Sequence, residues 1–461
     1  MTKLNEDRLT PLITEDYTGL QVKEQAVKYA EMIVAEYVFV VQNALSSMYR
    51  YDTETGLWRD DTNELIESYM DRVIPHQYSS HLVEEVKRKI RGRKYSPEIV
   101  LDGDAEHIVC KNGVLDLKTG QLSEFAPDGH HMSAVPVVFD PDAKCPMFLK
   151  FLDQVLSNQT DKDAIIEMFG YCLQKNYTYE IAVLLVGEGA NGKSVLLEVL
   201  RRFLGPENVT SVTPQNLTKS RFASSYLCHK LANIQPDIPA RPIEDAGTLK
   251  TLTGSDLTHA EVKYGGHSDF LNHAKLIFAG NAVPPSWDMS KAYCRRWRII
   301  DFLNTFSPQD PNYVPRDILL ARLTSSEELS GILNLALKGL LRLSQQHQLS
   351  GTPSMKDQQL DYMKRSDPAR YFLEAYIYQD TEGPPIPKAV LYDLYIKMCR
   401  FMGKVPIKRE TFGGKVKMFV SYAEDKRPRE RDETSDRERV YAWYGIGFNQ
   451  ERYDKETGAL I

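Results

Sequence analysis

The chain has 461 residues, of which 42% are hydrophobic and 26% are charged, so its composition excludes a largely disordered protein. The net charge of −6 excludes a protein that is basic over its whole surface, so any contact with nucleic acid is expected to be local. Six scattered cysteines without a CxxC pair exclude common zinc motifs and favour buried thiols in a reducing compartment. No apolar run approaches the ~20 residues that span a bilayer, and the polar first residues predict no signal peptide, so we expect a cytoplasmic protein without membrane contact.

Residues 1–145 are expected to form an N-terminal α/β domain. Apolar residues recur at helical spacing over residues 22–48, and residues 49–58 predict a strand, a turn and a second strand. A basic helix is predicted around residues 86–91, where a solvated face and a contact with DNA both remain open. A second hairpin is predicted over residues 108–117.

Residues 146–350 are expected to form an α/β domain around a parallel sheet. Residues 181–186 are wholly apolar, which is typical of a strand covered on both faces, and a helix is predicted to follow. Further strands are predicted at residues 231–234, 275–279 and 298–302. A linker is predicted near residue 351, so residues 351–461 are expected to form a small separate domain that begins with helices.

The segment between the apolar strand and the following helix matches the pattern G-x-x-x-x-G-K-[ST], and this strand–loop–helix context predicts a nucleotide site. Glycines let the backbone wrap round phosphates, and N–H groups at a helix N-terminus attract their charge. The alternative is a glycine-rich turn without a ligand. The predicted cradle consists of Gly187, Glu188, Gly189, Ala190, Asn191, Gly192, Lys193, Ser194 and the next residue, Val195. Lys193 is expected to reach the β- and γ-phosphates of ATP, and Ser194 is expected to ligate Mg²⁺.

Phosphoryl transfer also needs an acid near Mg²⁺ or water, a polar contact to the γ-phosphate and a cation for the transition state. Asp237 follows the strand at residues 231–234 and is the candidate catalytic and Mg²⁺-binding carboxylate; the alternative is an ordinary turn acid. Asn281 ends the next buried strand and is the candidate water or phosphate contact, although Asn is also a common turn former. Arg295 and Arg296 precede another strand, where a solvated basic turn and an arginine finger are both open.

The order of these elements resembles the superfamily 3 helicases, most closely the phage/plasmid primase-helicase branch, but without the primase module. The most specific parts of the resemblance are the phosphate cradle and Lys250-Thr251-Leu252-Thr253-Gly254-Ser255-Asp256. The resemblance implies an AAA+-type fold, a hexameric ring and ATP-driven 3′→5′ movement along DNA. It also implies that Asn281 is a sensor and that Arg295 or Arg296 acts on the nucleotide of the neighbouring subunit. Pro236 stands where such proteins usually carry a first acid, so Asp237 alone would serve, and a separate primase or polymerase is expected as partner.

A glycine-tipped hairpin is predicted over residues 258–275, between the candidate acid and the sensor strand. The resemblance implies that this hairpin enters the pore of the ring and contacts the DNA backbone through Lys263 and His267. A solvent-exposed hairpin without a ligand is the alternative.

The C-terminal region predicts two helices and a hairpin and resembles the winged-helix domain that ends many such proteins. Its second helix would present Lys408, Arg409 and Lys415 to DNA. The mixed-charge run at residues 426–433 is expected to be a solvated loop.

Three hypotheses follow for function. The first is a ring-forming, ATP-dependent DNA helicase that serves replication of a virus, plasmid or integrated element. The second is a DNA-binding initiator or remodelling ATPase without processive unwinding. The third is a small-molecule kinase, which would need neither an arginine from a neighbour nor a DNA-binding tail.

Overall fold

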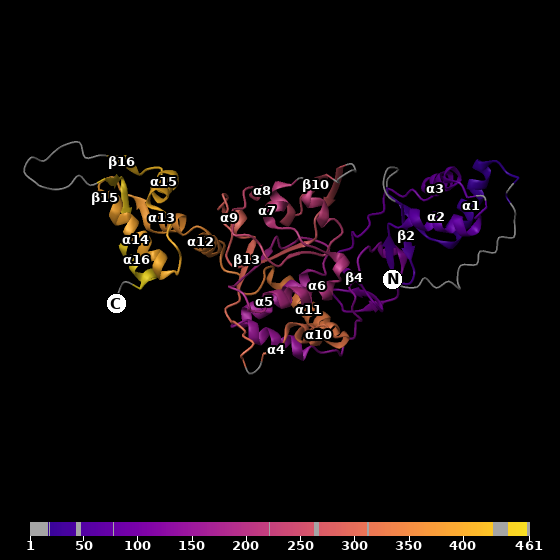
Figure 1. Cartoon of the computed structure of the whole chain (residues 1–461), viewed down its shortest axis with the longest axis horizontal. Helices are drawn as coiled ribbons and strands as arrows, with labels where there is room; N and C mark the ends of the chain where they lie inside the picture. The colour runs from indigo at the N-terminus through magenta and orange to yellow at the C-terminus, as the bar shows by residue number, and fades with distance from the viewer. Residues whose placement is uncertain are drawn as a thin grey trace, which may run out of the picture.

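The computed structural model describes residues 17, 19–42, 48–76, 78–220, 222–261, 267–310, 313–426 and 441–458. For residues 260, 261, 267–269 and 426 it describes the backbone alone. Figure 1 shows three successive bodies along the long axis, with helices α1–α3 at one end, the main sheet in the middle and α13–α16 at the other end. The sheet and its covering helices confirm the predicted α/β class.

The N-terminal body contains two small antiparallel sheets, ordered β1-β2-β3 and β4-β5-β6. Both predicted hairpins are confirmed, and Gly56 takes the left-handed conformation in the first turn with φ +70°. The elements are α1 (Val22–Glu36), β1 (Phe39–Val41), β2 (Met48–Asp52), β3 (Leu57–Arg59), α2 (Thr62–Val73), α3 (Ser80–Arg93), β4 (His107–Cys110), β5 (Gly113–Asp116) and β6 (Leu122–Ser123).

The helix predicted over residues 22–48 is too long. Helix α1 ends at Glu36, and strand β1 follows at Phe39–Val41. The Phe-Val-Val sequence of β1 is aromatic and β-branched, and such residues pack better in a strand than on a helix. Apolar residues continue at helical spacing beyond Glu36, but the residues of β1 favour a strand over a helix.

The central body is built on a five-stranded sheet with the order β13-β7-β12-β9-β8, in which every pairing is parallel. The predicted strands are confirmed. The strands are β7 (Ala182–Val186), β8 (Val209–Thr210), β9 (Ala232–Gln235), β12 (Lys275–Gly280) and β13 (Trp297–Asp301), with β10 (Leu257–Glu261) and β11 (His267–Leu271) forming a separate hairpin. The helices are α4 (Pro146–Val155), α5 (Gln159–Tyr171), α6 (Lys193–Leu204), α7 (Pro214–Lys219), α8 (Ala246–Thr253), α9 (Lys291–Cys294), α10 (Arg316–Leu323) and α11 (Ser326–Gln346).

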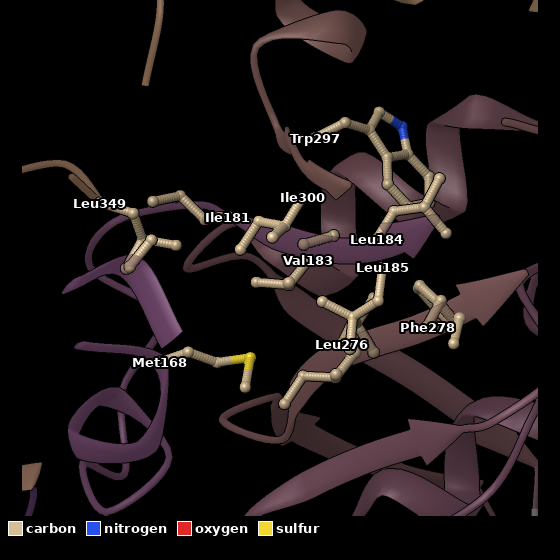
Figure 2. Close-up of a cluster of buried hydrophobic side chains, with 14 of the residues drawn as sticks. Met168, Ile181, Val183, Leu184, Leu185, Leu276, Phe278, Trp297, Ile300 and Leu349 are labelled. Atoms are coloured by element: carbon tan, nitrogen blue, oxygen red, sulfur yellow. The ribbon is translucent and has the colours of Figure 1, made fainter. Parts of the chain in front are cut away.

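The core of this body surrounds β7. Figure 2 shows Met168 of α5, Leu276 of β12 and Trp297 of β13 gathered around the apolar side chains of β7, and all three are buried. Each large apolar side chain buried in this way contributes about 1.5–3 kcal/mol. Because β7 is covered on both faces, the loop that follows it starts from a rigid strand.

The C-terminal body contains helices and two small antiparallel sheets, β14-β18 and β15-β17-β16. Residues 347–354 connect α11 to α12, and α12 packs back on the central body, where the Tyr362 hydroxyl donates to the Pro284 carbonyl at 2.8 Å. The predicted domain boundaries stay predictions. The elements are α12 (Met355–Ser366), α13 (Pro368–Tyr376), β14 (Ile377–Gln379), β15 (Ile386–Pro387), α14 (Lys388–Phe401), α15 (Arg409–Phe419), β16 (Glu424–Lys426), β17 (Ala442–Tyr444), β18 (Ile446–Phe448) and α16 (Gln450–Thr457).

Candidate functional site

Three neighbouring parallel strands end at the same level of the central sheet. Gly280 at the end of β12 pairs with Val186 at the end of β7, and Phe278 pairs with Gln235 at the end of β9. The segments that follow these strands are therefore brought together. In open α/β sheets, ligands bind beyond the carboxyl ends of strands where the strand order reverses, and β7 occupies that place.

The loop after β7 needs glycine at two positions for steric reasons. A Cβ on Gly187 would lie 2.2 Å from Asn191 Nδ2 and 2.5 Å from the Phe302 carbonyl oxygen. Gly192 has φ +89°, and a Cβ there would lie 2.5 Å from Val155 Cγ1. The loop is thus a tight cradle that larger residues would fill.

Lys193 is the first residue of α6 and is only 6% exposed. Its ammonium donates to the Gly187 carbonyl at 2.5 Å and to Asn191 Oδ1 at 3.1 Å. Burial lowers the pKa of Lys193, while the charge of Asp237 acts in the opposite direction. A cation is therefore held, largely desolvated, beside the loop.

A pocket of about 900 Å³ opens over this loop. Within the described part of the chain, the backbone N–H groups of residues 188–194 have no acceptor, and such groups at a helix N-terminus suit an anion. The predicted residues Glu188–Val195, Asp237 and Asn281 all line the pocket. The structure therefore brings these predicted nucleotide-site residues together.

Asn281 follows β12, the neighbour of β7, Asp237 follows β9, the next strand in the sheet, and both residues are exposed. Gln235 donates to the Asp237 carbonyl at 2.9 Å and accepts from Ser211 Oγ at 2.6 Å, so the end of β9 is tied to the segment after β8. Ser194 is exposed in the first turn of α6 and lines the same pocket. Ser194 and Asp237 thus offer a hydroxyl and a carboxylate for the hard oxygen coordination that Mg²⁺ prefers.

The part of the pocket lining that comes from α4 and α10 was missed by sequence reasoning. Phe151 and Val155 of α4 and Leu319 of α10 supply apolar surface, which suits the planar base of a nucleotide. Arg316, the first residue of α10, adds a cation to the same pocket. Their sequence context carried no signal, because ordinary helix residues become pocket residues only through the packing of α4 and α10 on the loop.

Arg295 and Arg296 do not line this pocket. They precede β13, whose first residue pairs with the first residue of β7, so they lie at the amino edge of the sheet, opposite the pocket. Both arginines form ion pairs with Glu180. This placement is compatible with the predicted action on a neighbouring subunit, which stays a prediction.

The predicted DNA contacts are spread over two other regions. The hairpin of β10 and β11 is confirmed and lies at the outer edge of the central body in Figure 1. Lys263 and the side chain of His267 lie outside the described residues. Lys408 and Arg409 are exposed at the start of α15, whereas Lys415 forms an ion pair with Asp367. The run at residues 427–433 also lies outside the described residues.

Several basic residues of helix α3 make internal contacts, and its contact with DNA stays a prediction. Lys87 is buried and pairs with Glu67 at 2.6 Å and Glu84 at 3.0 Å, and Arg88 pairs with Glu85 at 2.9 Å. In the part of the chain that the structure describes, no helix is both long and apolar enough to cross a membrane.

Comparisons with known proteins match several parts of the chain. A family described as D5 N terminal like matches residues 29–157, and a family of unknown function (DUF5906) matches residues 185–296. Putative helicase L207/L206 of Acanthamoeba polyphaga mimivirus is 24% identical over 373 residues, which are 76% of this chain and 38% of that protein. Putative helicase 121R of Invertebrate iridescent virus 3 is 22% identical over 331 residues, which are 64% of this chain and 35% of that protein.

An apo structure of the NrS-1 C-terminal region covers 91% of this chain and 99% of its own, with a TM-score of 0.46 and 12% identity. The chain spans only 38% and 35% of the lengths of the two viral relatives. The match over residues 29–157 and these two relatives relate the chain to viral helicase-like proteins.

Proposed function

We propose that this chain is an ATP-dependent DNA helicase of the AAA+ superfamily 3 type that acts in replication of a virus, plasmid or integrated element. The observation that carries the proposal is the convergence of Lys193, Asp237 and Asn281 on one pocket at the carboxyl edge of a parallel sheet. The names of the viral relatives favour unwinding over other uses of a nucleotide.

In this proposal the loop N–H groups and Lys193 bind the ATP phosphates, and Phe151 and Val155 bind the base. Ser194 and Asp237 would hold Mg²⁺, which supplies charge neutralisation to the phosphates when bound. Asn281 orients the attacking water or contacts the γ-phosphate. Pro236 lines the pocket beside Asp237, so Asp237 would bind Mg²⁺ without the adjacent second acid that such proteins usually carry.

The chain would assemble as a homohexamer, move 3′→5′ along one DNA strand and cooperate with a separate primase or polymerase. The hairpin of β10 and β11 would contact the DNA backbone through Lys263 and His267. The C-terminal body would act as a winged-helix-like DNA contact, because two helices are followed by strands β16 and β17 in the predicted order.

A fork-unwinding assay with ATP tests the proposal. Wild type should unwind forks with DNA-stimulated hydrolysis, Lys193→Ala should lose both activities, and Lys263→Ala should lose unwinding but retain basal hydrolysis. Lys23→Ala, which alters an exposed lysine of α1, is the matched control. Hydrolysis without any DNA stimulation would contradict the helicase proposal, and normal unwinding by Lys263→Ala would contradict the hairpin assignment.

The exposed carboxylate of Asp237 is tested separately. Asp237→Asn should raise the Mg²⁺ concentration needed for half-maximal hydrolysis, while Asp153→Asn on the exposed side of α4 should not. An unchanged Mg²⁺ requirement would remove Asp237 from the metal site.

The alternative is a replication initiator or remodelling ATPase that binds DNA without processive unwinding. The single carboxylate after β9 favours it, because a slow ATPase could drive assembly but not rapid movement. DNA-stimulated hydrolysis without strand separation would support this alternative.

A further inference from the structure

The pocket over the phosphate loop extends to both sides of β7. The sheet order places β12 and β9 on one side of β7 and β13 on the other. Asp237 and Asn281 follow β9 and β12, so the candidate contacts of Mg²⁺ and the γ-phosphate lie on the first side. Because the γ-phosphate and the base are opposite ends of a nucleotide, a nucleotide bound at the loop would extend its base towards the β13 side.

The segment after β13 supplies part of the pocket lining on that side. The Phe302 N–H donates to the Val186 carbonyl, at the end of β7, at 2.8 Å. The Phe306 N–H donates to the Ala190 carbonyl, in the loop itself, at 2.7 Å. Asn304 stands two residues from each of these bonds, which is at most about 7 Å even in an extended chain, and it lines the pocket. The backbone that carries Asn304 is therefore fixed beside the loop.

The side chain of Asn304 is held in one orientation. Its Nδ2 donates to the backbone carbonyl of Gln154, in α4, at 2.6 Å. A carbonyl oxygen only accepts hydrogen bonds, so the amide nitrogen of Asn304, and not its amide oxygen, must face it. Within the described part of the chain, no group donates to Asn304 Oδ1. The pocket lining thus contains a hydrogen-bond acceptor whose direction is set before a ligand arrives.

The polar side chains next to Asn304 are not fixed in this way. Gln154 and Thr305 are exposed and line the pocket, and among the described residues neither side chain has a hydrogen-bond partner. Ordering a free side chain on a ligand costs conformational entropy, which Asn304 has already lost through its bond to α4. Asn304 is therefore the best prepared of these groups to recognise a ligand.

The acceptor lies beside the apolar surface that binds the base in the proposed function. Phe151 and Val155 are one helical turn apart in α4 and flank Gln154 in the sequence. Apolar surface holds every base, because every base has an apolar face, so selection needs a polar group at the edge of the base. Adenine carries an exocyclic amine, which donates, where guanine carries a carbonyl oxygen, which accepts. An acceptor at this edge therefore favours adenine.

We propose that Asn304 selects the base of the nucleotide by accepting a hydrogen bond from the exocyclic amine of adenine through Oδ1. The bond from Nδ2 to the Gln154 carbonyl positions this acceptor. The inference rests on the proposed function, because it requires a nucleoside triphosphate in the pocket, and it adds which base the pocket prefers and which residue reads it.

The test compares ATP with purine riboside triphosphate, which lacks only the exocyclic amine. Each nucleotide displaces a fluorescent nucleotide labelled on its ribose, so affinity is measured without hydrolysis. Wild type should bind ATP about fivefold more tightly than purine riboside triphosphate, as one net hydrogen bond allows. Asn304→Ala should weaken ATP about fivefold and leave purine riboside triphosphate unchanged, so that the two nucleotides bind equally. GTP should bind wild type no more tightly than purine riboside triphosphate does.

Two further variants control for structure. Asn304→Leu has a side chain of similar size without a donor or acceptor, and it should bind the two nucleotides equally, as Asn304→Ala does. Asn112→Ala removes another exposed asparagine whose Nδ2 donates to a backbone carbonyl, that of Phe139 at 2.9 Å, but which does not line the pocket. It should keep the wild-type preference for ATP. Thermal unfolding of each variant shows whether the fold is retained.

Several results would overturn the inference while the proposed function stands. Equal affinity of wild type for ATP and purine riboside triphosphate, or for ATP and GTP, would show that the amine is not read. A preference for ATP that persists in Asn304→Ala would assign the reading to another residue. Equal weakening of ATP and purine riboside triphosphate in Asn304→Ala would make Asn304 a structural residue. Conversely, wild type that shows the expected preference but no DNA-stimulated hydrolysis would refute the proposed function alone, and wild type that binds no nucleotide would refute both.

Discussion

The Lys193 ammonium donates to the Gly187 carbonyl oxygen across 2.5 Å and so closes the glycine-rich loop with a side chain of its own. The same ammonium contacts Asn191 Oδ1 at 3.1 Å, and Asn191 Nδ2 donates to the Phe302 carbonyl at 3.3 Å. The loop, the start of α6 and the end of β13 are therefore one connected unit. This unit holds a buried positive charge in place before any anion arrives, so little reorganisation is needed on binding.

Lys193→Met keeps most of the side-chain stem but removes the charge. We expect ATP affinity to fall at least tenfold and hydrolysis at least a hundredfold, because a buried cation is worth more than a solvent-exposed one. A fluorescent ATP analogue would measure affinity, and phosphate release would measure hydrolysis. Because burial lowers the pKa of Lys193, the native state already disfavours its charge, and we expect the variant to remain folded. Unaltered binding would show that the ammonium does not meet the phosphates.

Gly192→Ala tests the steric basis of the cradle. The added Cβ would lie 2.5 Å from Val155 Cγ1, at a φ of +89° that alanine resists, so we expect a loss of about 1–3 kcal/mol in unfolding free energy. Urea unfolding would measure the loss.

Two further variants separate the clash from the backbone strain. Gly192→Ala combined with Val155→Ala should be less destabilised than the sum of the single variants, because the second change removes the clashing methyl group. Gly414→Ala, in α15 with open space around it, should instead stabilise by about 0.5–1 kcal/mol. Strict additivity at residues 192 and 155 would argue against the contact.

Local patterns predicted the elements that carry the phosphate cradle. The apolar run of β7 predicts a buried strand and the glycines that follow predict a tight loop, and the structure has both. The end of α1 was misplaced because apolar spacing alone does not distinguish the last turn of a helix from the start of β1.

Roles that depend on tertiary packing could not be predicted. Nothing in the sequence marks Arg316 as a pocket residue, since its place follows from how α10 packs against α6 and α4. Likewise, both arginines pair with Glu180 and Arg296 also donates to Thr253 Oγ1, and these two partners lie far away in the chain. The sequence predicts Lys415 as a DNA contact, because it does not show that Lys415 pairs with Asp367 at the start of α13.

Acid should destabilise the protein through buried histidines. Burial lowers the pKa of His273 to about 3 and that of His131 to about 4, from 6.5. Between pH 6.5 and these values, the two histidines bind protons in the unfolded chain but not in the native state. The free energy of unfolding therefore falls as the pH falls, by at most about 1.4 kcal/mol per pH unit for each histidine. Asp102, Lys175, Lys275 and His229 surround His273, and Asp102 alone opposes the shift.

Urea midpoints at pH 7.5, 6 and 5 would measure this dependence. His273→Asn should flatten the slope, whereas His76→Asn, at an exposed position, should leave it unchanged. A slope that is the same in wild type and His273→Asn would assign acid sensitivity to other groups.

The start of α15 should contribute to DNA binding, but its middle should not. Lys408 and Arg409 are exposed and, within the described residues, have no ion-pair partner, so they can displace counterions from DNA phosphates. Lys415 is neutralised by Asp367, whose carboxylate also caps α13 by accepting from the Arg370 N–H at 3.1 Å. Lys408→Ala and Arg409→Ala should therefore each reduce the slope of log affinity against log salt by about 1, equally for all sequences.

Lys415→Ala is the matched control, because it removes the same charge from the same helix. We expect it to leave the salt slope unchanged and to lower the unfolding free energy by about 1 kcal/mol, since Asp367 loses its partner. Fluorescence anisotropy with labelled DNA at several salt concentrations would measure the slopes, and thermal unfolding would measure the stability. If Lys415→Ala reduced the slope while Lys408→Ala did not, DNA would approach this body from the side of α13, and the ion pair would have to open on binding.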